Sequence, residues 1–138
     1  MIQQMSGSIL VVDDDELLRD AAVAILQAAG YSVTPVSSAD AALQTLADAS
    51  FDLVLLDIRM PGVDGLELLT QLRGSAEHAG QPVVMTSAVC DLESIERCIG
   101  LGIDGYLLKP VTPDLLLERI ARALRARGKG AAPLATAG

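Results

Sequence analysis

The segment FDLVLLDIRMPG, residues 51–62, decides how the rest of the chain is interpreted. Its apolar run, Leu53 to Leu56, is too short for a helix and is bounded by polar and turn-forming residues. Such a run is typical of a strand that is buried on both faces of a parallel sheet. The strand ends on Asp57, and Met60-Pro61-Gly62 then signals a turn. Open α/β sheets carry their chemistry at the carboxyl ends of strands, so Asp57 is a candidate functional residue; the alternative is that it only begins the turn.

Short apolar runs of the same kind alternate with stretches of helical periodicity along the whole chain. Strands are predicted at residues 8–12, 31–36, 53–57, 82–85 and 106–108. The helical stripes that follow them carry their first apolar residues at Leu17, Ala39, Leu66, Leu92 and Leu115. This alternation of five strands with five helices predicts a doubly wound α/β fold, with a parallel sheet, right-handed crossovers and helices on both faces.

Proline, glycine and capping residues predict where these elements begin, end and lie. Pro35 cannot donate to a sheet ladder, so the strand at 31–36 is expected at an edge of the sheet. Side chains that can cap a helix N-terminus stand at Ser37 or Ser38, at Asp64 with Glu67, at Asp91, and at Thr112 before Pro113. Helix C-termini are predicted at Gly30, Gly74 and Gly100.

Composition sets the class of protein. A chain of 138 residues can form one domain whose core needs neither a disulfide nor a structural metal. Aromatic residues make up only 2% and the net charge is -8, which argues against direct binding of nucleic acid by this domain. Cys90 and Cys98 lack metal-ligand spacing and are expected to be reduced thiols. With no membrane span or signal peptide recognised, a cytoplasmic protein is expected.

The two ends of the chain differ from its middle. Residues 1–7 are polar and are expected to be a disordered N-terminus. Residues 8–127 hold all the predicted strands and helices and are expected to form the domain. Residues 128–138, GKGAAPLATAG, have the composition of a flexible tail or the start of a linker.

Polar groups stand at the carboxyl ends of four of the five predicted strands. These groups are Asp13 and Asp14, Asp57, Ser87 and Lys109. In a parallel sheet all these ends lie along one edge, so we expect the side chains to converge on one pocket. Three clustered carboxylates suit a hard cation such as Mg²⁺, and no Cys or His is placed for zinc. A divalent cation beside an ammonium predicts a receptor for a phosphoryl group, with Asp57 as its nucleophile.

Each of these residues also has a purely structural interpretation. The acids Asp13 to Asp15 can serve as helix-start residues, as first turns favour. Ser87 can satisfy a loop backbone, and Lys109 can be an ordinary surface lysine. Tyr106 can simply pack on the fifth strand. The coincidence of the polar groups at successive strand ends, rather than any one of them, carries the functional interpretation.

Four motifs resemble one known family, the receiver domain of bacterial two-component response regulators, and its chemotaxis-type members in particular. The motifs are ILVVDDD (9–15), DLVLLDIRMPGVDG (52–65), PVVMTSA (82–88) and GYLLKP (105–110). They occur in the order typical of the family, and the resemblance covers residues 8–127. It implies a flavodoxin-like, five-stranded sheet in the order 2-1-3-4-5.

The resemblance also implies a metal site and a phosphoacceptor. Asp57 would accept a phosphoryl group from a phosphohistidine of a partner protein. Asp14 and Asp57 would bind Mg²⁺ through their carboxylates, Asp13 through a water molecule, and Arg59 through its backbone carbonyl. The residue type at Arg59 and at Val89 tunes the lifetime of the phosphorylated state in this family, and the sequence does not rank that lifetime here.

The switch residues follow from the same resemblance. Ser87 and Lys109 would contact the phosphoryl oxygens, and Tyr106 would be the aromatic residue whose rotamer follows the position of Ser87. The response would be a two-state change in the face made by the fourth helix, the fifth strand and the fifth helix. That face would meet an output domain, another protein or a second copy in a homodimer formed on phosphorylation.

The partner that supplies the phosphoryl group would be a sensor histidine kinase or a phosphotransfer protein. By the same resemblance it would dock on the first helix, near Leu17 and Ala21. The protein would catalyse only its own phosphoryl acceptance and loss, and would not be a turnover enzyme. The chain is interpreted as an excised or truncated receiver, with a stand-alone receiver and a phosphorelay shuttle as the alternatives.

Two other functions fit the fold class. A phosphohydrolase that uses an aspartyl-phosphate needs an acid two residues after its nucleophile, but Arg59 stands two residues after Asp57. Asp13 and Asp15 do have this spacing, but Leu17 stands where such enzymes usually have Thr or Val. A flavin or nucleotide module needs a Gly-, Ser- or Thr-rich loop after the first strand. That loop is acidic here, from Asp13 to Glu16, and would repel phosphates without a metal.

Overall fold

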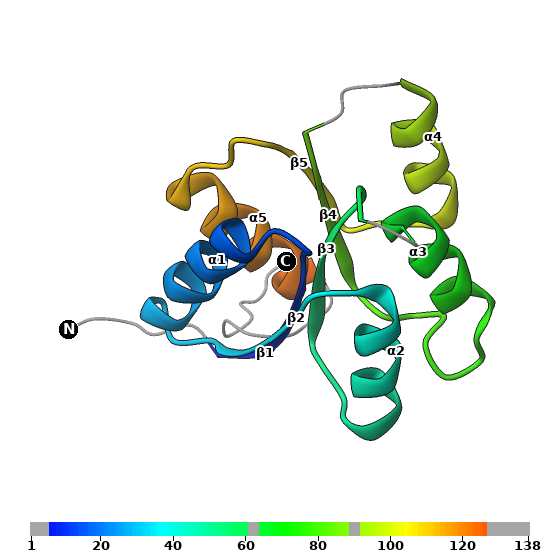
Figure 1. The fold of residues 1–138 in the computed structure, drawn as a ribbon, viewed down its shortest axis with the longest axis horizontal. Coiled ribbons are helices and arrows are strands. Elements are labelled where there is room, and N and C mark those ends of the chain that lie inside the picture. The colour runs from blue at the N-terminus through cyan, green and yellow to red at the C-terminus, as the bar shows by residue number, and fades with distance from the viewer. Residues whose placement is uncertain (1–5, 61–63, 89–91, 127–138) are drawn as a thin grey trace.

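The computed structural model describes residues 6–60, 64–88 and 92–126. In this part of the chain a five-stranded sheet lies between two layers of helices (Figure 1). Some of the predictions lie outside the described residues. They are the Pro61-Gly62 turn, Val89, Cys90, the cap at Asp91, the tail at 128–138 and most of the N-terminal segment 1–7.

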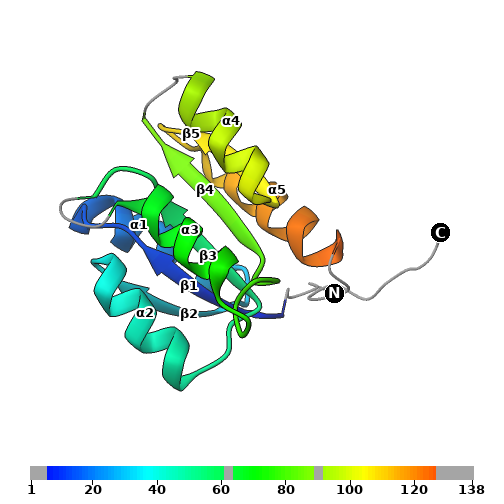
Figure 2. The ribbon, with the colours of Figure 1, turned by 90° about the vertical axis from the view of Figure 1, so that its right-hand side faces the viewer.

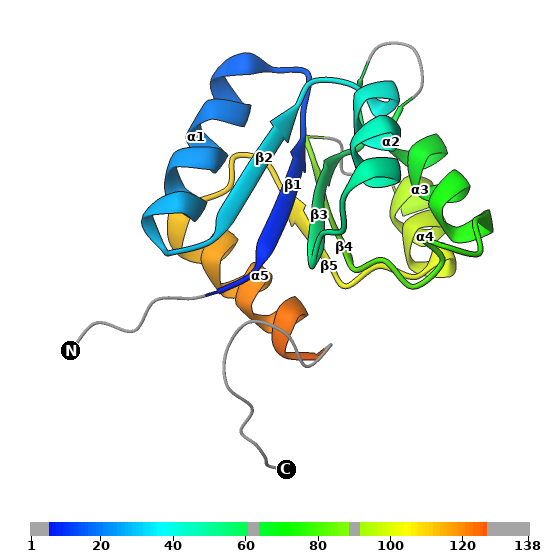
Figure 3. The ribbon, with the colours of Figure 1, turned by 90° about the horizontal axis from the view of Figure 1, so that it is seen from below.

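The strands run in the predicted chain order, all parallel. They are β1 (Ser8–Val12), β2 (Ser32–Val36), β3 (Leu53–Asp57), β4 (Val83–Ser87) and β5 (Gly105–Leu108). The helices are α1 (Glu16–Ala28), α2 (Ala39–Asp48), α3 (Gly65–Gly74), α4 (Leu92–Leu101) and α5 (Pro113–Ala126). The sheet order is β2-β1-β3-β4-β5, which confirms the fold class and the edge position of Pro35 (Figure 2, Figure 3).

Two apolar layers hold the sheet, one on each face. Helices α1 and α5 cover one face, and α2, α3 and α4 cover the other (Figure 1). Because side chains alternate along a strand, neighbouring residues of β3 such as Leu55 and Leu56 enter opposite layers. Each fully buried Leu, Ile or Val stabilises the fold by about 1.5–3 kcal/mol relative to an exposed one. All five residues of β3 are buried, as its unbroken apolar run predicts.

Capping side chains set the helix N-termini as predicted. The side-chain oxygens of Ser38, Asp64 and Thr112 accept hydrogen bonds from backbone N–H groups three residues further on, at 3.1, 2.9 and 3.2 Å. These bonds satisfy donors that the first turn of a helix would otherwise leave unpaired. Pro113 is the first residue of α5, where its missing N–H costs nothing.

Several predicted boundaries differ from the structure. Strands β2 and β4 each start one residue later than predicted, at Ser32 and Val83. Helix α4 does not end at Gly100 but continues to Leu101, because it is Gly102 that adopts the positive φ of 91° and donates to the carbonyls of Cys98 and Ile99. Strand β4 extends past the predicted end at residue 85 to Ser87, because β5 pairs alongside it as far as Leu108. Strand β5 itself starts one residue earlier than predicted, at Gly105.

Two further findings bear on the class of protein. Cys98 is a free thiol, fully buried on α4, and burial raises its pKa, as befits an inert core cysteine. Across the described ranges, no helix has the length and apolar content that crossing a membrane requires.

Candidate functional site

The parallel register brings the polar strand ends together at the carboxyl edge of the sheet. Val12 of β1 pairs with Leu56, so Asp13 and Asp57 follow these partners on neighbouring strands. Ser87, the last residue of β4, pairs with Leu108 of β5. The N–H of Lys109 donates to the carbonyl of Ser87 at 2.9 Å, which brings Lys109 to the same edge.

The three acids of the first loop take three different positions. Asp13 is buried, with 7% of the residue exposed, and its Oδ1 accepts a hydrogen bond from the N–H of Asp15 at 2.9 Å. Asp14 is exposed beside it. Asp15 is the N-cap of α1, because its carboxylate accepts from the N–H of Leu18 at 3.1 Å. The helix-start interpretation therefore applies to Asp15 but not to Asp13.

Asp13, Asp14 and Asp57 form one carboxylate cluster. One oxygen from each lies within 4.8 Å of the others, and within the described ranges this is the one group of three or more Asp, Glu, His or Cys side chains arranged to hold a metal ion. The carboxylates and their negative charge fit a hard divalent cation. The buried positions of Asp13 and Asp57 leave little water to screen their repulsion.

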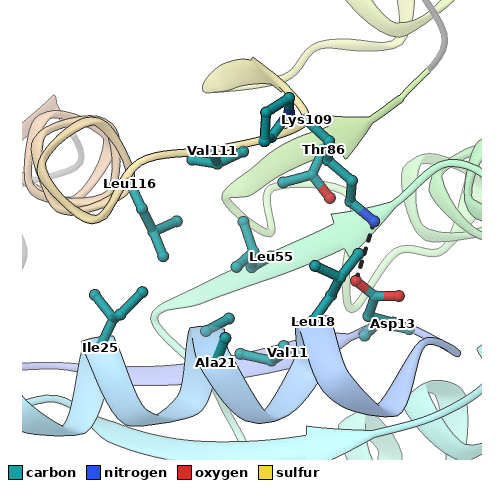
Figure 4. Close-up of a pocket in the computed structure, with 13 residues that line it drawn as sticks. Val11, Asp13, Leu18, Ala21, Ile25, Leu55, Thr86, Lys109, Val111 and Leu116 are labelled. Atoms are coloured by element: carbon teal, nitrogen blue, oxygen red, sulfur yellow. Dashed lines mark hydrogen bonds and ion pairs between the residues drawn. The ribbon is translucent and has the colours of Figure 1, made fainter.

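Lys109 supplies the cation of this cluster. Its Nζ lies 3.2 Å from Oδ2 of Asp13 and 3.3 Å from Oδ2 of Asp57. In Figure 4 the side chain of Lys109 extends toward Asp13, and a dashed line joins its ammonium to the Asp13 carboxylate. One ammonium against three carboxylates leaves two negative charges, so a divalent cation would balance the set.

The electrostatics of the cluster act most strongly on Asp57. The pKa of its carboxyl group is raised to about 6, chiefly by burial and to a smaller extent by the neighbouring Asp13 charge. The Lys109 ammonium and a hydrogen bond from the backbone N–H of Arg59 oppose this rise. A buried carboxyl group with a raised pKa, in a cluster with room for a cation, is a typical signature of a functional site.

The remaining predicted residues are placed around this cluster. Ser87 is fully buried. Tyr106 is half-buried on β5 and stands opposite Met85 in the register. The side chain of Arg59 is exposed, while its backbone N–H faces Asp57. The roles of these three residues stay predictions.

Gly65 is a site residue that the sequence analysis did not single out. Its N–H donates to the carbonyl of Ile58 at 2.7 Å, which seats the start of α3 against the chain leaving Asp57. A Cβ at this position would overlap the carbonyl oxygen of Asp57 and lie 2.8 Å from the Cα of Ile58. The available signal was a glycine directly after the N-cap Asp64, where a helix has no need of one.

Thr86 and Arg19 were also missed. Thr86 is buried, pairs with Asp57 in the register, and accepts the N–H of Ile58 at its carbonyl at 2.9 Å. Arg19 donates from Nη1 to the carbonyl of Asp13 at 2.9 Å and so holds the acidic loop against α1. Nothing in the local sequence distinguishes either residue, because both contacts depend on the packed sheet edge.

Comparison with known proteins identifies the family. The family model described as the response regulator receiver domain matches residues 9–121. The chain belongs to this receiver domain family. The resemblance seen in the sequence is therefore confirmed, and the chain is a receiver domain of two-component signalling. That identity supports a phosphorylation-dependent role, in a family that generally uses a divalent cation.

Individual relatives agree with this assignment. Transcriptional regulatory protein FixJ from Bradyrhizobium diazoefficiens is 36% identical over 119 residues, which are 86% of this receiver domain and 57% of FixJ. Response regulator protein FleR from Pseudomonas aeruginosa is 36% identical over 118 residues, covering 86% of this chain and 24% of FleR. The receiver domain thus spans 57% or less of the length of these two relatives.

Solved structures support the fold. The chemotaxis response regulator CheY4 of Vibrio cholerae matches with a TM-score of 0.80 at 29% identity, covering 86% of this chain and 99% of that one. NtrX from Brucella abortus matches with a TM-score of 0.82 at 35% identity, over 88% of this chain and 28% of NtrX. The match to CheY4 over nearly all of its length is consistent with the flavodoxin-like order observed in the sheet.

Proposed function

We propose that this receiver domain is a phosphorylation-dependent switch in which Asp57 accepts one phosphoryl group with the help of Mg²⁺. The observation that carries the proposal is the ammonium of Lys109 between Asp13 and Asp57, 3.2 and 3.3 Å from their carboxylates, with Asp14 completing an acidic cluster. This arrangement joins a nucleophile, a fixed positive charge and ligands for a hard cation.

Asp57 acts as the nucleophile. A carboxylate oxygen forms a bond to phosphorus while the bond between phosphorus and the histidine nitrogen of the donor breaks, and that nitrogen leaves with the bonding electrons. The attacking group must be ionised, so the pKa of about 6 leaves Asp57 largely reactive at pH 7. Lys109 neutralises charge on the transferred group. Mg²⁺ held by Asp13, Asp14, Asp57 and the Arg59 carbonyl would supply the remaining charge neutralisation.

Phosphorylation changes what Lys109 and Ser87 contact. Lys109 would exchange its contact with Asp57 for a phosphoryl oxygen, and the hydroxyl of Ser87 would donate to another. Ser87 ends β4 and Lys109 directly follows β5, and these strands lead into α4 and α5, so a shift at Ser87 would reach Tyr106 and the α4-β5-α5 face. Exposed apolar side chains on these elements support a contact surface there. They are Leu92, Ile99, Leu108 and Leu115.

We assign the partners from the family and from the exposed surface. A sensor histidine kinase or a phosphotransfer protein would supply the phosphoryl group and dock on α1, where Leu17 is 80% exposed. An output domain, another protein or a second receiver would bind the α4-β5-α5 face. The domain would be modified once per molecule and would not act as a turnover enzyme.

Labelling with a small phosphodonor tests the proposal. Incubation with acetyl phosphate and Mg²⁺ should add one phosphoryl group, measured by intact mass, and EDTA should prevent it. Asp57→Asn should abolish the label, whereas Asp52→Asn, at the opposite end of the same strand, should keep it. A label that survives in Asp57→Asn, or continuous hydrolysis of phosphate esters in large excess over protein, would refute the assignment.

A further inference from the structure

A cavity of about 150 Å³ lies next to the carboxyl edge of the sheet that carries Asp57, between α1 and the segment that joins β5 to α5. Figure 4 shows Ala21 and Ile25 on α1 facing Val111 and Leu116 across this space, with Leu55 behind them. The residues named here are all apolar. The proposed phosphoryl transfer uses none of these side chains directly, although Ala21 lies on the part of α1 where the phosphodonor would dock.

The size and lining of the cavity define the kind of molecule that fits. An apolar cavity of about 150 Å³ remains dry and binds benzene or xenon in a protein interior. The space here has a similar volume but opens to solvent on one side, and it takes one six-membered ring or a branched alkyl group of similar size. It exists because α1 presents alanine at two lining positions, Ala21 and Ala22, where a larger side chain would fill it.

The mouth of the cavity is polar. Asp13, Thr86 and Lys109 belong to the same lining as the apolar wall. A ring that enters therefore meets the carboxylate of Asp13 at one side of the opening, and a single hydroxyl on the ring can donate to it. A larger charged group would compete with the ion pairs that Lys109 makes with Asp13 and Asp57.

We propose that this cavity is an effector site for a small, neutral, single-ring molecule that carries one hydroxyl group. Its effect on phosphorylation rests on the proposed function, whereas binding itself does not. The occupant would pack against Pro110, Val111 and the stem of Lys109, and would hold this segment with the ammonium directed at the sheet edge. Binding would thus favour the arrangement that receives a phosphoryl group.

Thermodynamic linkage makes the coupling measurable from the ligand side. If the occupant favours the phosphoryl-binding arrangement, a phosphoryl mimic must strengthen binding of the occupant by the same factor. Coupling between sites is typically 5- to 150-fold. Lys109 belongs both to the cavity lining and to the acidic cluster, so the two sites share a residue. We expect beryllofluoride with Mg²⁺ to tighten binding of phenol at least fivefold, or about 1 kcal/mol.

The binding test uses the full chain labelled for methyl NMR, titrated separately with benzene and with phenol. Saturable shifts are expected at the methyl groups of Ile25, Leu55 and Leu116, and phenol should bind more tightly than benzene. Ala22→Leu should fill the cavity and remove the shifts. Ala47→Leu, an exposed position on α2, should leave them unchanged. If Ala22→Leu does not fold, Ala21→Leu serves as the filled variant.

The outcomes separate the two parts of the inference. Absence of saturable shifts, or shifts that persist in the filled variant, would overturn the site. Binding of phenol that beryllofluoride leaves unchanged, in a protein that Asp57 labelling shows to be active, would overturn the effector role. A protein that binds phenol but is never labelled would refute the proposed function and leave the site standing.

Discussion

Two aspartates stand at opposite ends of β3, and their surroundings differ. Asp52 comes just before the strand, half-exposed, and its Oδ2 accepts hydrogen bonds from the N–H and the hydroxyl of Ser8 at 2.9 and 3.3 Å. The Ser8 hydroxyl in turn accepts from the N–H of Asp52 at 3.1 Å. Asp57 ends the strand, 5% exposed, with two other carboxylates and one ammonium around it.

The difference lies in what balances each carboxylate. Asp52 lies among neutral donors that tie the start of β1 to the start of β3, so its charge is solvated by the fold itself. Asp57 loses water, gains like charges and is only partly compensated by Lys109, which is why its pKa is raised. At the amino end of β3, hydrogen bonds from Ser8 compensate the carboxylate of Asp52. At the carboxyl end, the negative charge around Asp57 is only partly neutralised by Lys109.

Removing each carboxylate should change stability in opposite directions, and this is the largest expected effect. At pH 7 without metal, Asp57→Asn should stabilise the fold by up to about 3 kcal/mol, because it removes a charge that burial disfavours. Asp52→Asn should destabilise it by about 1–2 kcal/mol, because it weakens the bonds to Ser8. Urea unfolding measures both, and two changes of the same sign would remove the contrast.

The pH dependence sharpens the same contrast. The pKa of Asp57 is raised in the fold to about 6, so the folded state binds more protons than the unfolded state between about pH 4 and pH 6. In EDTA this residue should therefore lower stability by up to about 3 kcal/mol as the pH rises through that window. Denaturant midpoints across the window should flatten in Asp57→Asn and keep the wild-type slope in Asp52→Asn.

A divalent cation should act at one end of the strand only. Mg²⁺ at 100 times its dissociation constant should add about 2.7 kcal/mol of stability at pH 7, through the acidic cluster. The gain should shrink at pH 5, where Asp57 is largely protonated. Thermal unfolding in Mg²⁺ against EDTA tests this, with Asp13→Asn expected to lose most of the gain. An equal loss in Asp52→Asn would contradict a site confined to the carboxyl end.

The last prediction concerns the backbone beside Asp57. Gly65→Ala should destabilise the fold by about 1–3 kcal/mol, because the added methyl group forces α3 away from the Asp57 carbonyl. The rate of labelling by acetyl phosphate should fall with it. Gly100→Ala on α4 is the matched control: a Cβ there meets no atom within 4 Å, and it should stabilise by about 0.5–1 kcal/mol. Unchanged labelling in Gly65→Ala would show that the close approach does not shape the site.

Local chemistry determined much of this protein. The unbroken apolar run of β3 required burial on both faces, Pro35 required an edge, and Ser38, Asp64 and Thr112 marked helix starts, because each depends on neighbours within a few residues. The parallel alternation then implied that the strand ends share one edge. From that implication alone the candidates Asp13, Asp57 and Lys109 were expected to meet, and the structure places them together.

Only the tertiary structure decided which role each of several similar residues takes. Three successive acids became a buried carboxylate at Asp13, an exposed one at Asp14 and a helix cap at Asp15, because the chain direction leaving β1 fixes where each points. The close approach at Gly65, and the cavity under Lys109, arise between elements far apart in the chain. Their causes are distance, volume and lost solvation in the packed state, which a linear pattern of residue types does not contain.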